Sequence, residues 1–400
     1  MVLSREAKSD LTWQCRDNGD LSAITCQRAW VEVDKFALAH NVQQLKKLLK
    51  PHTELMAVVK ADAYGHGAIR VAQTALENGA SWLAVATLGE GAELREAGIA
   101  APILILGAIN NPTEISAIAH WKLQPTIGNV GQAEIFSQTM EKLGKTMTVH
   151  LKLDTGMSRL GTPWHKARKF AQLVHSLPRL EIASIYSHLA TADDPDTTMM
   201  DRQQQRFHEA IAQIKQAGIK PPCLHLANSA ATIHGKAFHY DLVRIGLSLY
   251  GLYPSPHLRP KVELQPVLGV KARITQVKTI PAGTGVSYGH RFVAERELLM
   301  AVVSIGYADG VPRNLSNRLQ VLIRGKKVPQ IGSITMDQIM LDVSSIPDVQ
   351  PGEVVTLIGK DGDLAISADD WADALGTISW EILCGFKHRL PRVSVGLAED

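Results

Sequence analysis

One lysine stands where a parallel strand is expected to end. The segment Ala57-Val-Val-Lys-Ala-Asp-Ala-Tyr-Gly-His-Gly67 places Lys60 after a short apolar run, and in parallel barrels the carboxyl ends of the strands face the active site. A lysine in such a place can act as a Schiff-base nucleophile, although most strand-end lysines are simply solvated. Tyr64, followed by Gly65 and Gly67, adds a hydroxyl group and closely approaching backbone that suit an anion site.

Polar side chains also gather at the ends of the later apolar runs. His188 ends the sixth run, Asn228 and Ser229 follow the seventh, and Arg244 lies at the end of the eighth, just before Gly246 and Leu247. Phosphate sites in parallel barrels are often built by the loops after strands seven and eight, which makes Ser229 and the backbone at Gly246 and Leu247 candidate phosphate ligands. Each residue has an alternative interpretation, such as a buried core histidine, a helix cap or a surface ion pair. Their shared position at strand ends favours a functional site.

The elements that must position these groups alternate between residues 55 and 245. Short apolar runs are expected to form strands at 58–60, 83–87, 103–106, 124–127, 148–153, 182–188, 224–227 and 242–245, with amphipathic helices at 68–78, 131–143 and 199–217 among the segments between them. Eight such units close a (β/α)8 barrel, although an open doubly wound sheet gives a similar alternation. We predict an α/β barrel domain over residues 28–265.

Beyond residue 265 the pattern changes to strand-like runs separated by Gly and Pro. Strands are expected at 270–277, 298–303, 320–323, 339–343 and 354–358, and one helix between the capping-box pair Ser367 and Asp370 and the terminating Gly376. This predicts a mostly β domain over 266–400. Residues 1–27 contain no continuous apolar segment, and we predict a mobile N-terminal extension rather than a signal peptide.

The bulk composition excludes several classes of protein. The 400 residues are 45% hydrophobic and 20% charged, with a net charge of +3 that is spread along the chain. No apolar run is long enough to cross a bilayer and no basic block suggests nucleic acid, so we expect neither partner. The four cysteines, Cys15, Cys26, Cys223 and Cys384, are far apart. They predict no metal site and no disulfide framework, and they favour a reducing cytoplasm.

Eight motifs together resemble the alanine racemase family from about residue 29 onward. They are Val59-Lys-Ala-Asp-Ala-Tyr-Gly-His-Gly67, Lys152-Leu-Asp-Thr-Gly-Met-Ser-Arg-Leu-Gly161, Tyr186-Ser-His-Leu-Ala-Thr-Ala-Asp193, His225-Leu-Ala-Asn-Ser-Ala230, Val243-Arg-Ile-Gly246, Val286-Ser-Tyr-Gly289, Ile305-Gly-Tyr-Ala-Asp-Gly310 and Met336-Asp-Gln338. One motif alone would be weak, but all eight follow the family's order. The resemblance implies a pyridoxal-phosphate-dependent isomerase that interconverts L-alanine and D-alanine and supplies D-alanine for peptidoglycan.

The resemblance also implies catalytic roles. Lys60 carries the cofactor covalently and acts as a base on one face of the substrate, and Tyr288 acts on the other face. Two groups are needed because a proton removed from one side of Cα must be returned to the other. Arg244 is the family's partner for the cofactor's pyridine nitrogen. Since a guanidinium only donates, that nitrogen stays unprotonated and the cofactor is a weaker electron sink, which limits side reactions.

Further positions follow from the same resemblance. Cofactor contacts are assigned to Tyr64, His188, Asn228, Ser229, Arg244, Gly246 and Leu247, substrate contacts to Arg159, Met336 and Tyr307, and supporting positions to Lys152, Asp337 and Trp380. In this scheme Arg159 contacts the cofactor's phenolic oxygen and the substrate carboxylate, with the Met336 N–H as second donor. His188 links Arg244 to Tyr288, and Lys152 matches a lysine that is carbamylated in some members.

The chain departs from the family pattern at two positions. Trp380 stands where a tyrosine is common, and an indole can donate a hydrogen bond but cannot accept one. Ser333 replaces an arginine of the entrance corridor, whose other charges match Asp194 and Arg313, so we expect a less positive channel. Family members are head-to-tail homodimers in which the β domain of one chain covers the barrel of the other, which implies shared active sites.

Three other functions remain open at this stage. Basic amino-acid decarboxylases hold the same cofactor on a similar plan but pair its ring nitrogen with an acid, and Arg244 argues against them. A non-enzymatic cofactor-binding protein of the single-barrel type leaves the second domain unexplained. Serine or broad-specificity racemases fit the same residues, although the broad-specificity enzymes usually carry an export signal.

Overall fold

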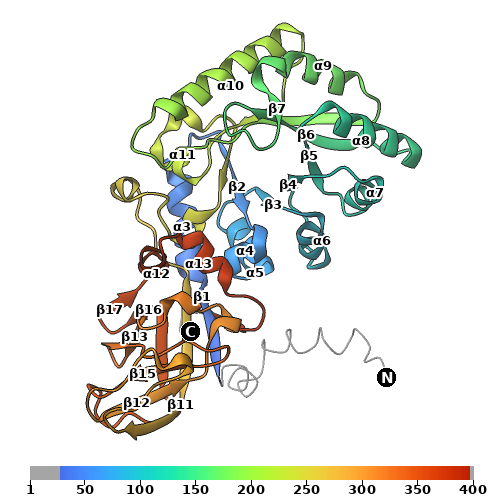
Figure 1. Ribbon diagram of the computed structural model, residues 1–400. Helices are drawn as coiled ribbons and strands as arrows, with labels where there is room; N and C mark the ends of the chain where they lie inside the picture. The colour runs from blue at the N-terminus through green and yellow to red at the C-terminus, as the bar shows by residue number, and fades with distance from the viewer. Residues whose placement is uncertain (1–27, 397–400) are drawn as a thin grey trace, which may run out of the picture. The chain divides into compact units, whose positions relative to one another are not determined.

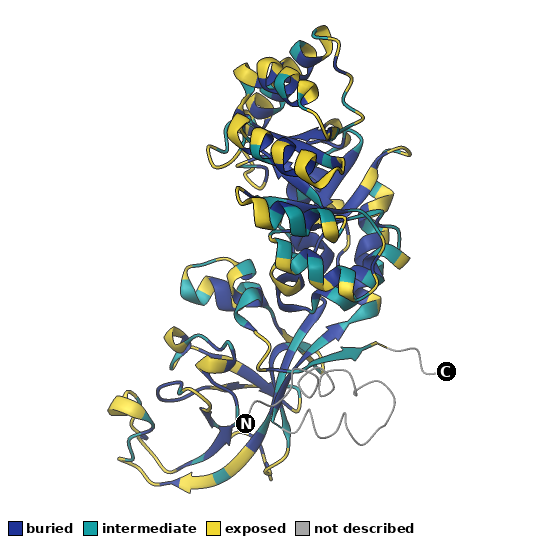
Figure 2. Cartoon of the chain, turned by 90° about the vertical axis from the view of Figure 1, so that its right-hand side faces the viewer, coloured by how far each residue is buried: buried dark blue, intermediate teal, exposed yellow. Residues whose placement is uncertain are grey.

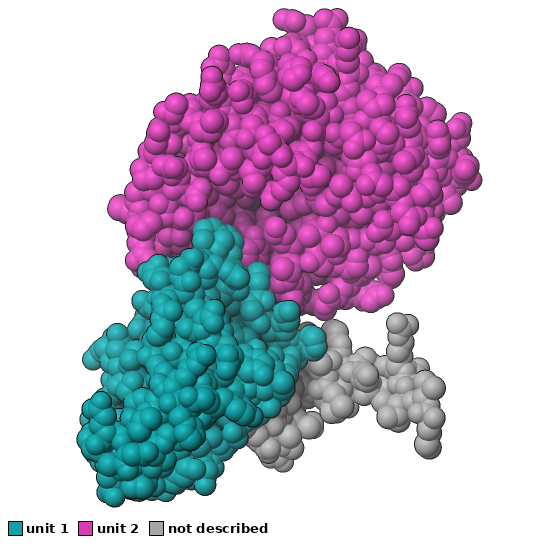
Figure 3. Space-filling model, viewed as in Figure 1, with its two compact units in different colours: residues 1–34, 268–400 teal, residues 35–267 magenta. Residues whose placement is uncertain are grey.

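The structure is a computed structural model that describes residues 28–396. The predicted N-terminal extension, residues 1–27, lies outside the described residues. The chain divides into two compact units, which Figure 3 colours separately: residues 35–267 form one, and, among the described residues, 28–34 and 268–396 form the other. The second unit is therefore built from segments on both sides of the first in the sequence.

Eight parallel strands form the barrel of the first unit, and a ninth, the short β7 (Thr162–Pro163), pairs with β6 beside them (Figure 1). The eight are β2 (Glu54–Val58), β3 (Trp82–Val85), β4 (Ile103–Ala108), β5 (Gln124–Ile127), β6 (Met147–Asp154), β8 (Leu180–Tyr186), β9 (Cys223–His225) and β10 (Leu242–Ile245). They pair in the order β10-β2-β3-β4-β5-β6-β8-β9. The N–H of Arg244 on β10 donates to the carbonyl of Ala227, just beyond β9, at 3.0 Å. The sheet is a nearly closed parallel barrel, which confirms the predicted fold class.

Helices lie between the strands in the sequence and cover the outside of the barrel. They are α3 (Lys35–Leu48), α4 (Lys60–Gly65), α5 (Ala68–Glu77), α6 (Leu88–Glu96), α7 (Pro112–His120), α8 (Val130–Leu143), α9 (Ala167–Ser176), α10 (Thr198–Gln216) and α11 (Ser229–His234). On α9 the buried residues Phe170, Ala171 and Val174 recur at helical spacing. Figure 2 shows the same division, with buried strands inside and exposed helix faces outside.

Sheet strands and two helices make up the second unit. These are β1 (Ala29–Asp34), β11 (Leu268–Ile280), β12 (Leu298–Val303), β13 (Gln320–Ile323), β14 (Lys326–Pro329), β15 (Ile339–Asp342), β16 (Val354–Asp361), β17 (Leu364–Ile366), α12 (Ala368–Leu375), α13 (Ser379–Gly385) and β18 (Arg392–Val395). The long strand β11 is central, because it pairs with β1, β12 and β16. The C-terminal part is thus mostly β, as the Gly- and Pro-punctuated runs predicted.

Strand β1 belongs to this second sheet and not to the barrel. It pairs antiparallel with β11, with Trp30 opposite Lys271, and parallel with β18, with Glu32 opposite Val393. The sequence pattern predicts residues 28–34 in the barrel domain, and the structure corrects that assignment. The physical reason is that alternating apolar and polar residues in a strand indicate which side chains are buried. They do not indicate which sheet the strand joins.

The predicted helix after residue 367 illustrates how local signals set boundaries. The Ser367 hydroxyl accepts the Asp370 N–H at 3.1 Å, the Asp370 carboxylate accepts the Ser367 N–H at 2.7 Å, and Gly376 ends α12 in the left-handed conformation. Helix α13 was not predicted, and it has no side-chain cap.

Within residues 28–396 no helix has the length and apolar character of a membrane span, and no group of three metal-binding side chains converges.

Candidate active site

Lys60 begins a left-handed turn. Strand β2 ends at Val58, two residues earlier than expected, and residues 61–64 adopt φ values of 52–55°. Non-glycine residues in this conformation cost roughly 1–2 kcal/mol each, so the surroundings must hold them. The Glu90 carboxylate accepts the N–H of Ala61 at 2.7 Å, and the Asp62 carboxylate accepts the N–H of Ala68 at 2.8 Å. The turn thereby fixes the backbone that carries the lysine.

Backbone N–H groups and the Ser229 hydroxyl gather after strands β9 and β10, and the Tyr64 hydroxyl lies beside them. Ser229 begins α11, and its Oγ lies 3.0 Å from the N of Gly246 and 3.5 Å from the N of Ser248. Gly246 has no room for a side chain, because a Cβ there would lie 2.7 Å from the Tyr64 hydroxyl. Leu247 follows at the start of a short 3-10 turn. These donors form a cradle of the kind that binds phosphate.

Asn228 has a structural role beside this cradle. It is the N-cap of α11, and its side-chain oxygen accepts the N–H of Ala231 at 3.0 Å. The helix-cap interpretation therefore describes its side chain. A contact between Asn228 and a cofactor stays a prediction.

Arg244 lies in the barrel with its guanidinium surrounded by acceptors. Its Nη1 is 2.9 Å from Nδ1 of His225, and its Nη2 is 2.7 Å from the carbonyl of Ser187 and 3.2 Å from Nδ1 of His188. It also stands 5.1 Å above the ring of Tyr186. Burial lowers the pKa of Arg244 to about 10, so the group remains a cation near neutral pH. The structure thus brings Arg244 and His188 together, as the resemblance implied.

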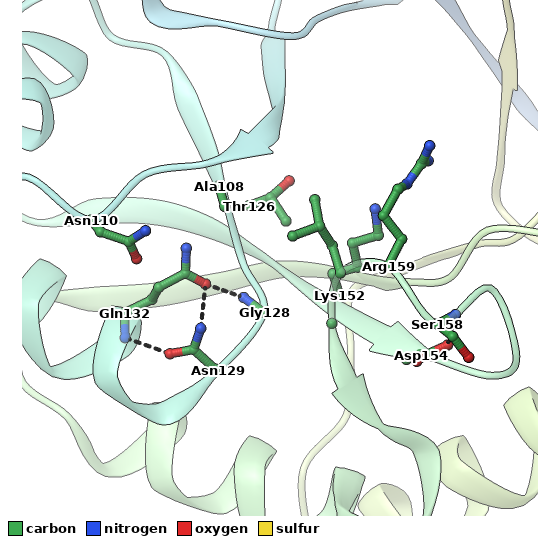
Figure 4. A pocket seen from close by; sticks show the side chains of 12 residues that line it. Ala108, Asn110, Thr126, Gly128, Asn129, Gln132, Lys152, Asp154, Ser158 and Arg159 are labelled. Carbon is green, nitrogen blue, oxygen red and sulfur yellow. Dashed lines mark hydrogen bonds between the residues drawn. The ribbon is translucent and has the colours of Figure 1, made fainter.

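Lys152 and Arg159 line a cavity of about 520 Å³ at the end of strands β5 and β6. Figure 4 shows their side chains extending in the same direction, beside Thr126. Lys152 is buried, whereas Arg159 lies on the exposed loop after β6. That loop begins at Asp154, whose carboxylate accepts the N–H groups of Gly156 at 2.9 Å and Ser158 at 3.1 Å.

Positive charge converges on the mouth of this barrel. Burial, and then the charges of Arg244, Arg159 and Lys60, together lower the pKa of Lys152 to about 8. Burial and then the same three residues with Lys152 hold the pKa of His188 well below its ordinary value. Four basic side chains therefore face one another here. Such a cluster suits an anionic ligand, because a bound phosphate or carboxylate would offset their mutual repulsion.

Tyr288 lies in the second unit, on a turn that the sheet anchors. Val286 is buried in an apolar cluster with Leu298 and Met300, while the Tyr288 side chain is 73% exposed. The Ser333 hydroxyl donates to the Tyr288 carbonyl at 2.7 Å, and the Ser287 hydroxyl donates to the Ser333 carbonyl at 2.7 Å. Ser333, which the resemblance matches to a corridor position, is buried, and its hydroxyl holds the tyrosine turn.

Met336 and Tyr307 lie on two loops that are bonded to each other. The N–H of Tyr307 donates to the carbonyl of Thr335 at 3.0 Å, and the N–H of Ala308 donates to the carbonyl of Met336 at 3.1 Å. Gly306 permits this approach, since a Cβ there would lie 2.3 Å from the Thr335 carbonyl oxygen. The Met336 side chain, like that of Tyr288, lines a shallow pocket on this unit.

Asp337 and Trp380 occupy supporting positions in the same unit. Asp337 forms an ion pair with Arg389, whose Nε lies 3.5 Å from the buried carboxylate of Asp309. Asp309 is in turn held by Arg28 through two hydrogen bonds of 2.7 and 2.8 Å. Trp380 lies on α13. Its predicted effect on phosphate binding remains a prediction.

Some residues of the site carried no signal of their own in the sequence. Tyr186 and His225 both contact Arg244. Both lie inside motifs of the family resemblance, but neither was assigned a role of its own. His150 and Ser184 also face the barrel interior. Polar residues within otherwise apolar strand runs are the one signal that would have drawn attention to them.

The donor set defines a class of protein. A lysine beyond a strand end, a phosphate cradle after strands β9 and β10, and a buried arginine are typical of barrel enzymes that hold pyridoxal phosphate. The cradle around Gly246 and the cluster of basic side chains both fit a phosphorylated, anionic cofactor. Lys60 would hold it, with Ser229 and Tyr64 at its phosphate and Arg244 at its ring nitrogen.

Comparisons with known proteins identify the family. Residues 33–254 match the family model "Alanine racemase, N-terminal domain", and residues 267–394 match "Alanine racemase, C-terminal domain". The alanine racemases of Synechocystis and Nostoc are 68% and 67% identical to this chain, over 92% and 94% of it and 99% and 98% of their own length. This chain belongs to the alanine racemase family, whose members are pyridoxal-phosphate-dependent isomerases.

Solved structures agree with this assignment. An alanine racemase from Bacillus anthracis with bound L-Ala-P superposes with a TM-score of 0.88 at 38% identity, covering 92% of this chain and 95% of that one. An alanine racemase from Streptomyces coelicolor gives a TM-score of 0.87 at 36% identity, covering 94% of this chain and all of that one. The likeness extends through both units.

Proposed function

We propose that this chain is an alanine racemase that interconverts L-alanine and D-alanine, with D-alanine destined for peptidoglycan. The observation that carries the proposal is the buried guanidinium of Arg244, which lies in the same barrel as Lys60 and the phosphate cradle. A carboxylate in that place would keep the cofactor's ring nitrogen protonated and favour decarboxylation or transamination. A donor-only arginine favours the milder proton transfer that racemisation needs.

Each residue has a definite task in this proposal. Pyridoxal phosphate, when bound, draws electrons from Cα of the amino acid and so weakens its C–H bond. The Arg159 guanidinium and the Met336 N–H hold the substrate carboxylate. Lys60 takes or returns the proton on one face of Cα, and the Tyr288 hydroxyl serves the opposite face.

We further propose that two copies of the chain share their active sites. Tyr288, Met336 and Tyr307 are 73%, 52% and 42% exposed on the second unit, which is unusual for large apolar side chains. A second copy whose barrel meets this face would cover them. Neither of the described cysteines, Cys223 and Cys384, forms a disulfide, which supports a cytoplasmic enzyme.

The proposal is tested by assaying the purified protein with pyridoxal phosphate. L-Alanine, L-serine and L-lysine are supplied separately, D-amino acids are measured by chiral chromatography, and carbon dioxide is collected. We expect D-alanine without carbon dioxide, and a kcat/KM for alanine at least about tenfold above that for serine, because the pocket must reject an added hydroxyl group. Release of carbon dioxide, or a preference for serine, would contradict the proposal.

A further inference from the structure

A line of buried hydrogen bonds runs through the barrel behind Arg244. Its Nη1 meets Nδ1 of His225 at 2.9 Å, and Nε2 of His225 meets Oγ of Ser184 at 2.8 Å. The same Oγ lies 2.6 Å from Nδ1 of His150, whose Nε2 lies 2.7 Å from Oε1 of Gln124. The five residues come from β10, β9, β8, β6 and β5, which are consecutive around the barrel.

The two ends of the line determine the direction of its bonds. A guanidinium can only donate, so Nδ1 of His225 is an acceptor, and the proton of this imidazole is on Nε2 and is donated to Ser184. At the other end Nε2 of His150 faces Oε1 of Gln124, which can only accept, so this nitrogen carries the proton of His150. Nδ1 of His150 is then an acceptor, and the Ser184 hydroxyl donates to it.

The opposite direction does not satisfy the line. If a neutral His150 donated from Nδ1 to Ser184, its Nε2 would face Oε1 of Gln124 as one acceptor against another. Only a charged imidazolium could donate to both neighbours. Both rings are instead neutral, because burial lowers the pKa of His150 to about 3 and burial together with Arg244 holds the pKa of His225 well below its ordinary value.

Packing holds the line in place. The ring of Tyr186 stacks on His225 at 4.6 Å with an angle of 10° between the planes, and its hydroxyl lies 2.7 Å from Oγ1 of Thr126. No ion pair found among residues 28–396 involves Arg244. A buried cation without a carboxylate depends on neutral acceptors for its stability, and His225 is one of these acceptors.

We propose that His225, Ser184 and His150 are positioning residues that orient the Arg244 guanidinium toward the ring nitrogen of the cofactor. Because Arg244 also donates to Nδ1 of His188 at 3.2 Å, the same direction leaves His188 with its proton on Nε2 and thus with a donor. The link to the cofactor rests on the proposed function. The proton positions do not, because they follow from this chain alone.

The proton positions are measured first, by long-range proton–nitrogen NMR on the full-length protein with nitrogen-15 histidine, with and without pyridoxal phosphate. We expect His150 and His225 to be neutral near pH 7 and to carry the proton on Nε2 in both samples. A proton on Nδ1, or a charged ring, at either residue would overturn the proposal. This result is independent of whether the protein racemises alanine.

The positioning role is tested by Ser184→Ala, with Ser137→Ala as the matched control. Ser137 is also buried, and its hydroxyl donates to the carbonyl of Pro178 at 2.8 Å. We expect Ser184→Ala to lower kcat and to raise the dissociation constant of pyridoxal phosphate, each by about tenfold, with KM for alanine nearly unchanged. Wild-type values in Ser184→Ala, or equal losses in both variants, would overturn the role.

A second pair of variants covers the case in which Ser184→Ala does not fold. Asparagine at position 150 offers an oxygen where the histidine offers Nδ1, whereas leucine offers no acceptor. We expect His150→Asn to retain the wild-type affinity for pyridoxal phosphate and His150→Leu to lose about tenfold. Equal affinities in the two variants would contradict the proposal.

Discussion

At the scale of single residues, the site contains several basic side chains whose positive charges repel one another. Lys152 is buried beside Arg159, Arg244 and Lys60, and its pKa falls to about 8. Free lysine has a pKa near 10.5. Between these two values the unfolded chain binds more protons than the folded one, so the free energy of unfolding increases with pH across that window.

This linkage predicts the effect of Lys152→Met. Below pH 8 the variant should be more stable than the wild type by up to about 3 kcal/mol, since one pKa unit corresponds to about 1.4 kcal/mol. The difference should vanish by about pH 10.5, when the lysine is neutral in both states. Denaturant unfolding of the cofactor-free protein at both pH values, in buffer free of carbon dioxide, provides the measurement.

Lys142→Met supplies the control for this prediction. Lys142 is exposed on α8, so its replacement should change the free energy of unfolding by less than about 0.5 kcal/mol at either pH. A Lys152→Met variant that is less stable than the wild type at pH 7 would show that the lysine is not under charge repulsion.

A second residue-scale prediction concerns Ser333. Its hydroxyl holds the carbonyl of Tyr288, so Ser333→Ala should lower kcat about fivefold through loss of one hydrogen bond, with little change in cofactor affinity. Ser344→Ala, which removes a hydroxyl that donates to Asp342 in the same unit, should leave kcat unchanged. If Ser333→Ala retains full kcat, the bond does not position the tyrosine.

The sequence allowed part of the site to be predicted at this scale. Lys60, Ser229 and Arg244 could be grouped because parallel strands bring their carboxyl ends together. The line from His225 through Ser184 to His150 could not, because contacts across a barrel interior depend on the stagger between strands, which no single strand encodes. The role of Ser333 was also hidden, since its partner is a backbone carbonyl.

At the scale of elements, the left-handed turn at residues 61–64 is the feature that the conformational preferences of its own residues disfavour. Strands β5, β10, β12 and β13 have the bounds that their apolar runs predicted. The run at 58–60 was displaced, because the chain leaves the strand early to enter this turn. Residues in a disfavoured conformation persist only where other contacts hold them, here the hydrogen bond from Ala61 to the Glu90 carboxylate and that from Ala68 to the Asp62 carboxylate.

The turn predicts an unusual response to glycine. Ala61→Gly should raise the free energy of unfolding by about 0.5–1 kcal/mol, because glycine adopts a positive φ without steric cost. Ala117→Gly, inside helix α7, should lower it by about 1 kcal/mol. Denaturant unfolding of the two variants compares them directly, and a loss of stability in both would mean that the turn at Ala61 is not strained.

At the scale of the whole molecule, the groups for the two faces of the substrate lie on different units. Lys60 is on the barrel unit, and Tyr288 is on the β unit with its ring largely exposed. The proposed dimer supplies one from each copy. Such an arrangement was predicted from the family resemblance and not from the residues themselves, because periodicity in one chain carries no information about its partner.

The central claim is that Lys60 of one chain and Tyr288 of another complete each site, and subunit exchange tests it most directly. Inactive Lys60→Ala protein is mixed with an equal amount of inactive Tyr288→Phe protein, exchange is verified by native mass spectrometry, and racemisation of alanine is measured. Random exchange makes about half of the dimers mixed, and each mixed dimer has one intact site, so about a quarter of the wild-type activity per site should return. Activity that stays at the level of the separate variants after complete exchange would contradict the account.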